Sequence, residues 1–510
     1  MNNFSFFNSL IIVSIISLLL FIGCKDPSNE ISGNDPAISD DYSDISDFKN
    51  YKKWGPYNVH DPSCIKAGDY FYLYSTDAYY FPRKDGNREN IREEWQKKRA
   101  LMDSLGFGNI PIRRSKDLVH WEFVGWALKE IPQAAIDHIK KASGGDKPRN
   151  IWAPYIFEWK GEYRLYYAVS LFGKKISYIG MASSLNPEGP WELKGDVVKT
   201  DNSSVMNAID PSVVVDVETG RHWMHYGSYF GGLYCVELNP STGLALKEAD
   251  KGHLVARRAD YKELNLEAPE IIYNPELKEY FLFTSYDALF THYNVRVGRS
   301  KNPQGPFFDY FGKDLADTTN NFPILTYAYR FSGHPGWAGV GHCGVVNDGG
   351  DFFMVHQGRL APDNLMIVLH VRKIFWNSEG WPVVSPERYA AIPQNDYSKD
   401  DLKGNWELIS LNEIADSVRL WQGQQPPGDW HYDTIMFNNP TKIELEEDGS
   451  IVQWAGYKWS FVENKLFIEK GTEKTECMLA SAWDWENKKQ TIIFTGIQPN
   501  GICIWGKKIN

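Results

Sequence analysis

Short runs of β-branched and aromatic residues, separated by polar turns, fill most of the chain. Five segments follow one plan: an acidic or polar signature, often beside Pro, then a hydrophobic run, a turn with Gly or charged residues, and an aromatic-rich run. Such runs around a turn predict a β-hairpin in each segment. The segments read HDPSCIKAGDYFYLYST from His60, IWAPYIFEWKGEYRLYYAVS from Ile151, IDPSVVVDVETGRHWMHYGS from Ile209, LEAPEIIYNPELKEYFLFTS from Leu266 and GHCGVVNDGGDFFMVHQG from Gly341.

Five copies of one hairpin unit indicate a repeat architecture. The stretch from Tyr51 to Tyr389 gives about 68 residues to each unit, enough for a four-stranded blade with insertions. A β-sandwich is the alternative, but it would not place the same signature at the start of every hairpin. We therefore predict an all-β fold whose main part is a five-bladed β-propeller over residues 51–395.

The strand pattern starts again at Asn405 with GNWELISL and continues to Ile502–Trp505. It predicts a separate small all-β domain over residues 400–510, resembling a barrel. This domain is rich in Trp but contains no clustered set of catalytic residue types. Cys477 and Cys503 lie within it, and their spacing leaves open whether they form a disulfide.

The N-terminal segment has the features of a targeting signal. The apolar run Leu10–Ile22 is too short to cross a membrane comfortably. Its end, Phe21-Ile22-Gly23-Cys24, resembles the lipobox of bacterial lipoproteins, which implies a lipid on Cys24 that holds the protein to a membrane. We expect a signal peptide over residues 1–23, a flexible tether over 24–50, and an outer-membrane lipoprotein at the cell surface or the periplasmic face. An ordinary secretory signal is the alternative.

Charge and composition narrow the partners. The net charge of −11 argues against nucleic acid, which requires a clustered positive surface. Aromatic residues make up 15% of the chain, and their rings can pack in cores or stack on the apolar faces of sugars. We expect the protein to be a monomer.

The hairpin signatures carry the candidate chemistry. In a propeller the innermost strands begin near the central axis, so residues at these starts converge: Asp61, Trp152, Asp210, Glu267 and His342. Acid–Pro pairs can also mark turns, but three converging carboxylic acids are costly to bury without a use. Such a set suits glycoside hydrolysis, in which one carboxyl protonates the leaving oxygen and another activates water. The third can raise the pKa of the acid by like-charge repulsion.

The order of HDP, IDP and EAP along the chain resembles glycoside hydrolase family 43. PGWAGVGHCGV and IFWNSEGWPVVSPERY are similar to segments of its endo-α-1,5-L-arabinanases, and the resemblance covers about residues 51–390. It implies inverting cleavage of internal α-1,5-L-arabinofuranosyl linkages in arabinan, a plant cell-wall polysaccharide. Two alternatives stay open: an exo-α-L-arabinofuranosidase or β-xylosidase of the same family, and a non-catalytic carbohydrate-binding lipoprotein. The C-terminal domain would bind glycan or brace the propeller.

The resemblance also implies roles for the three acids. Asp61 matches the general base of the family, Asp210 the Asp that orients the acid and adjusts its pKa, and Glu267 the general acid. Glu270 competes for the last role, but EAP aligns with WAP of the second unit, which places Glu267 opposite Trp152. For an inverting mechanism, the carboxyls of Asp61 and Glu267 are expected to lie roughly 6.5–9.5 Å apart.

Three further residues follow from the same resemblance. Trp152 is expected to stack on a sugar ring beside the scissile bond, and Arg359 to bind sugar hydroxyls. His342 is expected to lie near calcium or another cation at the propeller axis. Because imidazole is a poor ligand for a hard cation, water oxygens would supply most of the coordination.

Overall fold

The computed structural model describes residues 48–77, 100–258, 266–317, 320–361, 367–414 and 436–509. The predicted signal peptide, Cys24 and most of the tether lie outside these ranges. A short 3-10 helix, η1 (Phe48–Lys53), opens the described chain. Within the described residues, no helix is long and apolar enough to cross a membrane.

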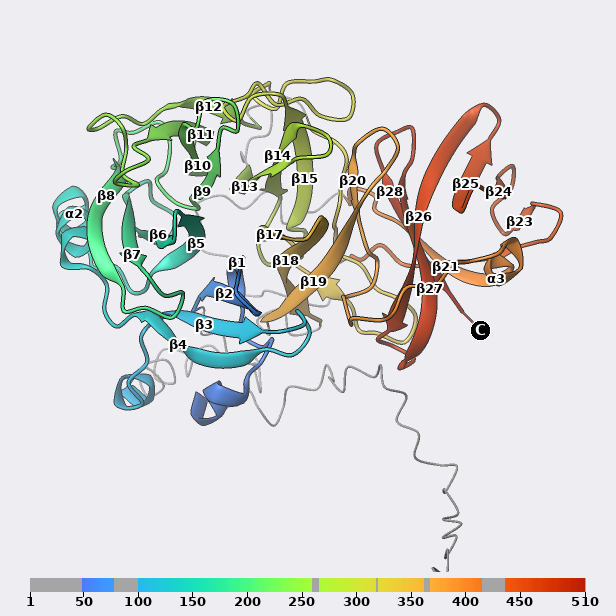
Figure 1. The fold of residues 1–510 in the computed structure, drawn as a ribbon, viewed down its shortest axis with the longest axis horizontal. Helices are drawn as coiled ribbons and strands as arrows, with labels where there is room; N and C mark the ends of the chain where they lie inside the picture. The colour runs from blue at the N-terminus through green and yellow to red at the C-terminus, as the bar shows by residue number, and fades with distance from the viewer. Residues whose placement is uncertain are drawn as a thin grey trace, which may run out of the picture.

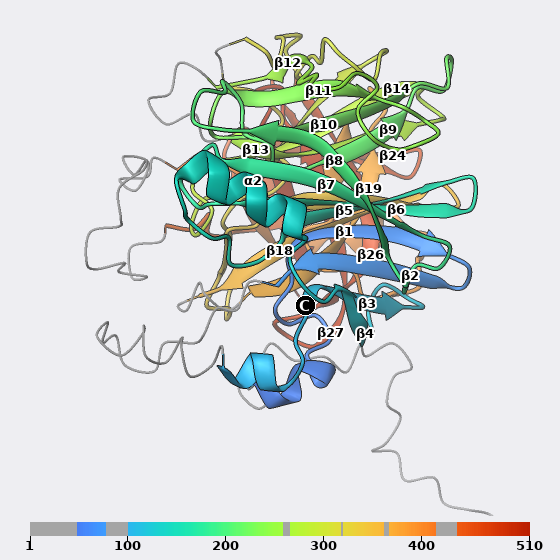
Figure 2. The ribbon, with the colours of Figure 1, turned by 90° about the vertical axis from the view of Figure 1, so that its left-hand side faces the viewer.

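Five antiparallel sheets are arranged around a central axis (Figure 1). The first two are regular four-stranded blades whose strands follow the chain order from the axis outward. Blade 1 contains β1 (His60–Ala67), β2 (Tyr70–Thr76), β3 (Asn109–Ser115) and β4 (Glu122–Leu128). Blade 2 contains β5 (Trp152–Trp159), β6 (Glu162–Ser170), β7 (Ser177–Ser184) and β8 (Glu192–Thr200). Helix α2 (Gln133–Ser143) packs on the outer side of blade 2 (Figure 2).

The other three blades follow the same plan with variations. Blade 3 contains β9 (Ser212–Val215), β10 (His222–Ser228), β11 (Gly232–Leu238) and β12 (His253–Ala256). Blade 4 has three strands, β13 (Leu266–Asn274), β14 (Glu279–Tyr286) and β15 (Asn294–Ser300). Blade 5 contains β17 (Cys343–Asp348), β18 (Asp351–Leu360), β19 (Ile367–Trp376) and β20 (Pro382–Val384), and the short β16 (Trp337–Ala338) pairs with β18.

The five innermost strands close a ring around the axis, since β1, β5, β9, β13 and β17 each contact the next and β17 contacts β1. Two features secure the last junction. The segment before β1 pairs with β19, through hydrogen bonds from Asn58 N to Ile367 O and from Leu369 N to Pro56 O. Gly344 of β17 lies so close to β1 that a Cβ there would come within 2.8 Å of the Pro62 carbonyl oxygen. The predicted five-bladed propeller is therefore confirmed.

After α3 (Lys399–Leu402), the C-terminal part forms an eight-stranded sheet in the order β23-β22-β21-β28-β27-β26-β25-β24. An isolated bridge between Ser450 and Lys458 brings its two edges together, so the sheet is nearly a closed barrel, as predicted. Cys477 and Cys503 are buried and free, and no disulfide joins them. The strands are β21 (Gly404–Ser410), β22 (Thr441–Leu445), β23 (Ile451–Val452), β24 (Lys458–Val462), β25 (Lys465–Lys470), β26 (Glu473–Asp484), β27 (Lys489–Ile497) and β28 (Cys503–Lys508).

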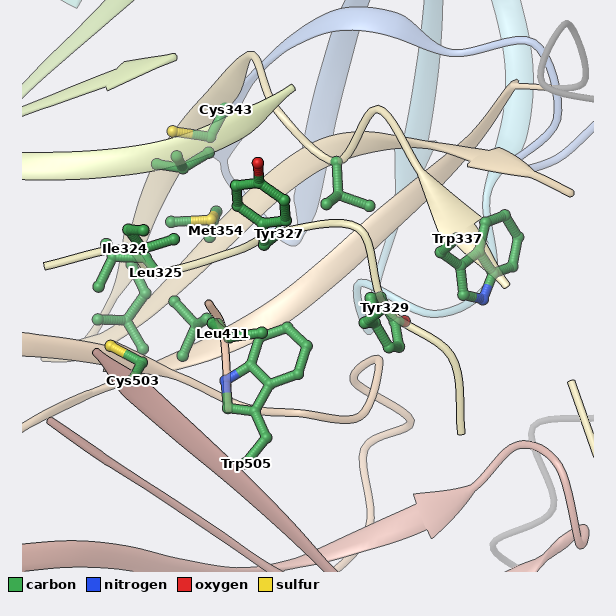
Figure 3. Packing of buried hydrophobic residues seen from close by; sticks show 14 of the residues in the cluster. Ile324, Leu325, Tyr327, Tyr329, Trp337, Cys343, Met354, Leu411, Cys503 and Trp505 are labelled. Atoms are coloured by element: carbon green, nitrogen blue, oxygen red, sulfur yellow. The ribbon is translucent and has the colours of Figure 1, made fainter. Parts of the chain in front are cut away.

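One hydrophobic cluster spans the propeller and the barrel. Figure 3 shows Leu411 and Trp505 of the C-terminal part among propeller residues such as Tyr327 and Met354. Because buried apolar area is the main favourable contribution to folding, this shared core holds the two parts together.

An ionic cluster lies in the same interface. Lys507 Nζ lies 3.0 Å from carboxylate oxygens of both Glu387 and Asp484 and also pairs with Glu486. The three carboxylates are close enough to hold a metal ion, but Lys507 Nζ already pairs with all three of them.

Candidate active site

Five residues with left-handed backbone mark equivalent points of the five blades. Their φ values lie between 39° and 56°, and each lies within two residues of the start of an innermost strand: Asp61, Ala153, Asp210, Ala268 and His342. Residues other than Gly rarely adopt this conformation. Its recurrence shows that the five signatures share one backbone geometry, which directs the neighbouring side chains to the same end of the axis.

The register supports the choice of Glu267 over Glu270. Trp152 and Glu267 each directly precede the left-handed Ala, so WAP and EAP are equivalent in the backbone. Asp61 and Asp210 occupy the left-handed position itself. The three acids therefore do not occupy one backbone position, since the longer Glu267 side chain starts one residue earlier.

Glu270 serves as a clamp between inner strands. Its carboxylate accepts hydrogen bonds from the backbone N–H of Val345 at 2.9 Å and from Ser212 Oγ at 3.0 Å. Its side chain is buried, whereas Glu267 is half-buried. Both Glu270 oxygens are thus used to join blades 3, 4 and 5, and the sequence alone did not reveal this structural role.

Asp61 sits between two imidazoles. Its Oδ1 lies 2.9 Å from His342 Nδ1 and 2.6 Å from His60 Nδ1, and its Oδ2 accepts a hydrogen bond from Thr76 Oγ1 at 2.7 Å. Burial disfavours the charged carboxylate, but His342 and His60 outweigh burial and hold the pKa of Asp61 well below its usual range. Asp61 is therefore ionised throughout the physiological pH range.

His342 carries the complementary charge. Burial lowers its pKa, but the carboxylate of Asp61, with Asp210 and Glu267 adding, raises it to about 9. His60 differs, because burial lowers its pKa more than Asp61 raises it. The site thus combines an ionised Asp61 with a protonated His342 at neutral pH.

Glu267 and Asp210 behave in the opposite way to Asp61. Burial raises the pKa of Glu267 to about 7, against the hydrogen bond that Tyr293 Oη donates to Oε1 at 2.8 Å. Burial also raises the pKa of Asp210 well above its usual range, and the charges of Glu267 and Asp61 add to the effect. Asp210 therefore retains its proton at neutral pH, whereas Glu267 retains its proton up to a pH of about 7. Burial is the larger cause, and like-charge repulsion supplements it.

The two residues predicted to bind sugar, Trp152 and Arg359, differ in how deeply they are buried. Trp152 is half-buried, and its Nε1 donates to Asn150 Oδ1 at 2.7 Å. The next residue, Ala153, donates its N–H to Thr76 Oγ1, the group that bonds Asp61. Ala153, the neighbour of Trp152, is therefore linked to Asp61 through one hydroxyl.

Arg359, by contrast, is fully buried on β18, and its guanidinium lies 4.5 Å from the centroid of the Phe290 ring. Its charge helps to lower the pKa of His60. The sugar-binding role of Arg359 stays a prediction.

The sequence analysis missed the polar side chains that bind the acids. His60 could have been identified, since it directly precedes Asp61 in the HDP motif, whereas no motif marks Thr76 or Tyr293. Thr76 ends β2, and Tyr293 directly precedes β15. Both reach the site because their blades converge there, which no local pattern encodes.

The donor set at the axis suits a cation only through water. Within the described ranges, no three carboxylate, imidazole or thiolate atoms at the axis lie close enough to chelate an ion, and the one such group is the Lys507 cluster. His342 Nδ1 faces Asp61, so this residue could offer a cation only its other ring nitrogen, and only after that nitrogen has lost its proton. The cation at the axis stays a prediction.

Comparison with known proteins also indicates a glycoside hydrolase. The sequence profile of glycosyl hydrolases family 43 matches residues 55–382, and that of a C-terminal lipocalin-like domain matches residues 386–506. An extracellular endo-α-(1→5)-L-arabinanase of Thermotoga petrophila is 27% identical, over 88% of this chain and 93% of its own length. An extracellular exo-α-(1→5)-L-arabinofuranosidase of Cellvibrio japonicus is 30% identical, over 64% of this chain and 86% of its own.

The solved structures agree in architecture. The crystal structure of the endo-1,5-α-L-arabinanase from Thermotoga petrophila superposes with a TM-score of 0.70 at 26% identity, covering 89% of this chain and 99% of its own. The family profile covers the five innermost strands and all three acids. The chain therefore belongs to glycosyl hydrolases family 43.

Proposed function

We propose that the protein is an inverting endo-arabinanase that cleaves internal α-1,5-L-arabinofuranosyl linkages of arabinan. The observation that carries this proposal is the opposite protonation of two converging carboxyls. Asp61 is held ionised by His342, whereas Glu267 retains a proton up to a pH of about 7. An inverting glycosidase needs this combination of one base and one acid.

In the proposed mechanism, Asp61 removes a proton from the attacking water. Its low pKa keeps it available as a base, and Thr76 and His342 fix the direction of its oxygens. Room for that water requires roughly 6.5–9.5 Å between the carboxyls of Asp61 and Glu267.

Glu267 donates its proton to the departing glycosidic oxygen. Tyr293 orients it through the hydrogen bond to Oε1, and Asp210 lies beside it, accepting the N–H of Ala268 at 3.2 Å. Trp152 would stack on the sugar at the scissile bond.

The endo mode is supported by the Thermotoga petrophila relatives, which are named endo-arabinanases and match both domains. The exo mode is the second candidate, because the Cellvibrio japonicus relative carries that name. Timed digestion of linear arabinan, branched arabinan and xylan, with sizing of early products, distinguishes them. Endo action releases mixed oligosaccharides first, whereas arabinose alone at early times would contradict the proposal.

We also propose that a cation held mainly by water binds at the axis beside His342. When bound, it would supply positive charge near Asp61, the same role that protonated His342 plays without it. Metal analysis of the purified protein and of His342→Ala tests this. Equal metal content in the two proteins would show that His342 does not contribute to cation binding.

For the location, we propose export with a lipid anchor on Cys24. The relatives of Thermotoga petrophila and Bacillus subtilis are named extracellular, which supports export. Mass spectrometry of the N-terminal peptide would detect the lipid, and Cys24→Ser would move the protein from the membrane to the soluble fraction. A membrane-bound Cys24→Ser protein would rule out this anchor.

A further inference from the structure

The C-terminal barrel has a cavity of about 390 Å³ at one end. Side chains on a strand alternate between its two faces, and β21 illustrates this. Trp406 and Leu408 point into the barrel core, whereas Ile409 points into the core shared with the propeller. Ser410 and Asn412 follow on the inward side and line the cavity. The cavity therefore continues the barrel interior outward, and we call it the barrel mouth.

The opposite wall of the barrel mouth is also formed by residues on the inward side of a strand. Thr441 begins β22, on the side of the strand that carries Ile443 and Leu445 into the barrel core. Trp454 completes the wall, and its ring stacks on Tyr457 with 3.8 Å between the ring centroids. A cavity of this size at the mouth of a β-barrel is a common form of small-molecule site.

The lining specifies an uncharged, hydroxyl-rich ligand. None of the described residues that line the barrel mouth is ionisable. Amides (Asn412, Asn438, Asn439) and hydroxyls (Ser410, Thr441) offer both donors and acceptors, and Trp454 and Phe437 supply aromatic surface. None of these lining side chains carries a positive charge that would pair with a phosphate or carboxylate, and a surface this rich in amides and hydroxyls suits a sugar better than an acyl chain.

The barrel mouth also touches the propeller beside the catalytic acid. The Met436 carbonyl hydrogen-bonds to His292 Nε2 at 3.0 Å, and the next residue, Tyr293, donates to Glu267. Phe437 packs so closely on Gly336 that a Cβ there would come within 2.8 Å of the ring. Asn439 Oδ1 accepts hydrogen bonds from both Nε and Nη2 of Arg330, at 3.0 and 2.8 Å.

We propose that the barrel mouth is a second carbohydrate-binding site, which holds a short stretch of the same neutral furanoside chain that the catalytic site cleaves. This inference rests on the proposed function for the identity of the sugar. Two linked sites on one polymer raise the overall affinity without any new contact, because the second binding event becomes intramolecular. The C-terminal domain would then both brace the propeller and retain the substrate.

Isothermal titration of Glu267→Gln with α-1,5-arabinotriose tests the proposal, since a trisaccharide is short enough to occupy the sites separately. We expect two bound molecules per protein, with the ligand recovered intact. Adding Trp454→Ala should reduce the number to one. Adding Phe467→Ala, which removes a ring from the outer face of the same barrel, should leave two.

Two results would overturn the barrel mouth as a site: one bound molecule in Glu267→Gln alone, or two in the Trp454→Ala variant. Trp454→Phe guards against a folding defect, since it keeps a ring and should retain the second molecule with weaker affinity. The proposed function fails separately, if the wild-type protein releases nothing from arabinan. In that case two-site binding of another neutral oligosaccharide, lost in Trp454→Ala, would still support the barrel mouth.

Discussion

His342 Nδ1 lies 2.9 Å from Asp61 Oδ1. Blade 5 therefore supplies the positive charge that keeps Asp61 of blade 1 ionised. The contact forms where the ring closes, between β17 and β1. Closure of the fold and activation of the proposed base therefore depend on the same junction.

Replacing His342 should change the acid limb of the pH profile. In His342→Gln the positive neighbour is lost, so the pKa of Asp61 rises toward or above its usual value, because burial is no longer offset. Activity at low pH should then fall, and the acid limb of kcat/KM should move to higher pH. The exposed His253→Gln is the matched control, and an unchanged acid limb in His342→Gln would contradict the role of this pair.

Glu267 and Glu270 provide a matched pair of substitutions. Glu267→Gln removes the proton donor and should lower kcat by about 10²–10⁴-fold. Glu270→Gln weakens the clamp to Val345 and Ser212 and should lower the free energy of unfolding by about 1–2 kcal/mol while activity persists. Steady-state kinetics with thermal denaturation measures both, and the reverse pattern would exchange the roles of the two residues.

The basic limb of the profile should report Glu267. A donor must be protonated to act, and burial raises the pKa of Glu267 to about 7. Activity should therefore fall as the pH rises through about 7. Asp210 keeps its proton in this pH range, so Asp210→Asn retains a neutral side chain and should leave the basic limb in place. A limb that moves to lower pH in Asp210→Asn would show that Asp210 is charged beside Glu267.

Glu413 should stabilise the propeller from the C-terminal part. Its carboxylate lies 3.4 Å from Arg258 Nη2 and 3.9 Å from Arg296 Nη2, and it accepts a hydrogen bond from Asn320 Nδ2 at 2.5 Å. Both arginines are almost fully buried, so removal of a compensating charge is costly. Glu413→Gln should lower the free energy of unfolding by about 2 kcal/mol. The exposed Glu473→Gln should not change it, and equal stability of the two variants would refute the contribution.

The sequence by itself determined the number of blades, the small second domain and the identity of the converging acids. It could do so because each blade is a local hairpin with its own turn chemistry, and because the repeat marks equivalent positions. It also selected Glu267, since the alignment of EAP with WAP reflects a backbone conformation that recurs at Ala153 and Ala268.

Only the tertiary structure decided the state of those acids. The opposite pKa shifts of Asp61 and Glu267 depend on burial and on His342, which lies in a different blade from each of them. The roles of Thr76 and Tyr293, the clamp at Glu270 and the free Cys477 and Cys503 are likewise contacts between distant segments. A local pattern predicts which strand a residue occupies, but electrostatic energies depend on distances that only the closed ring establishes.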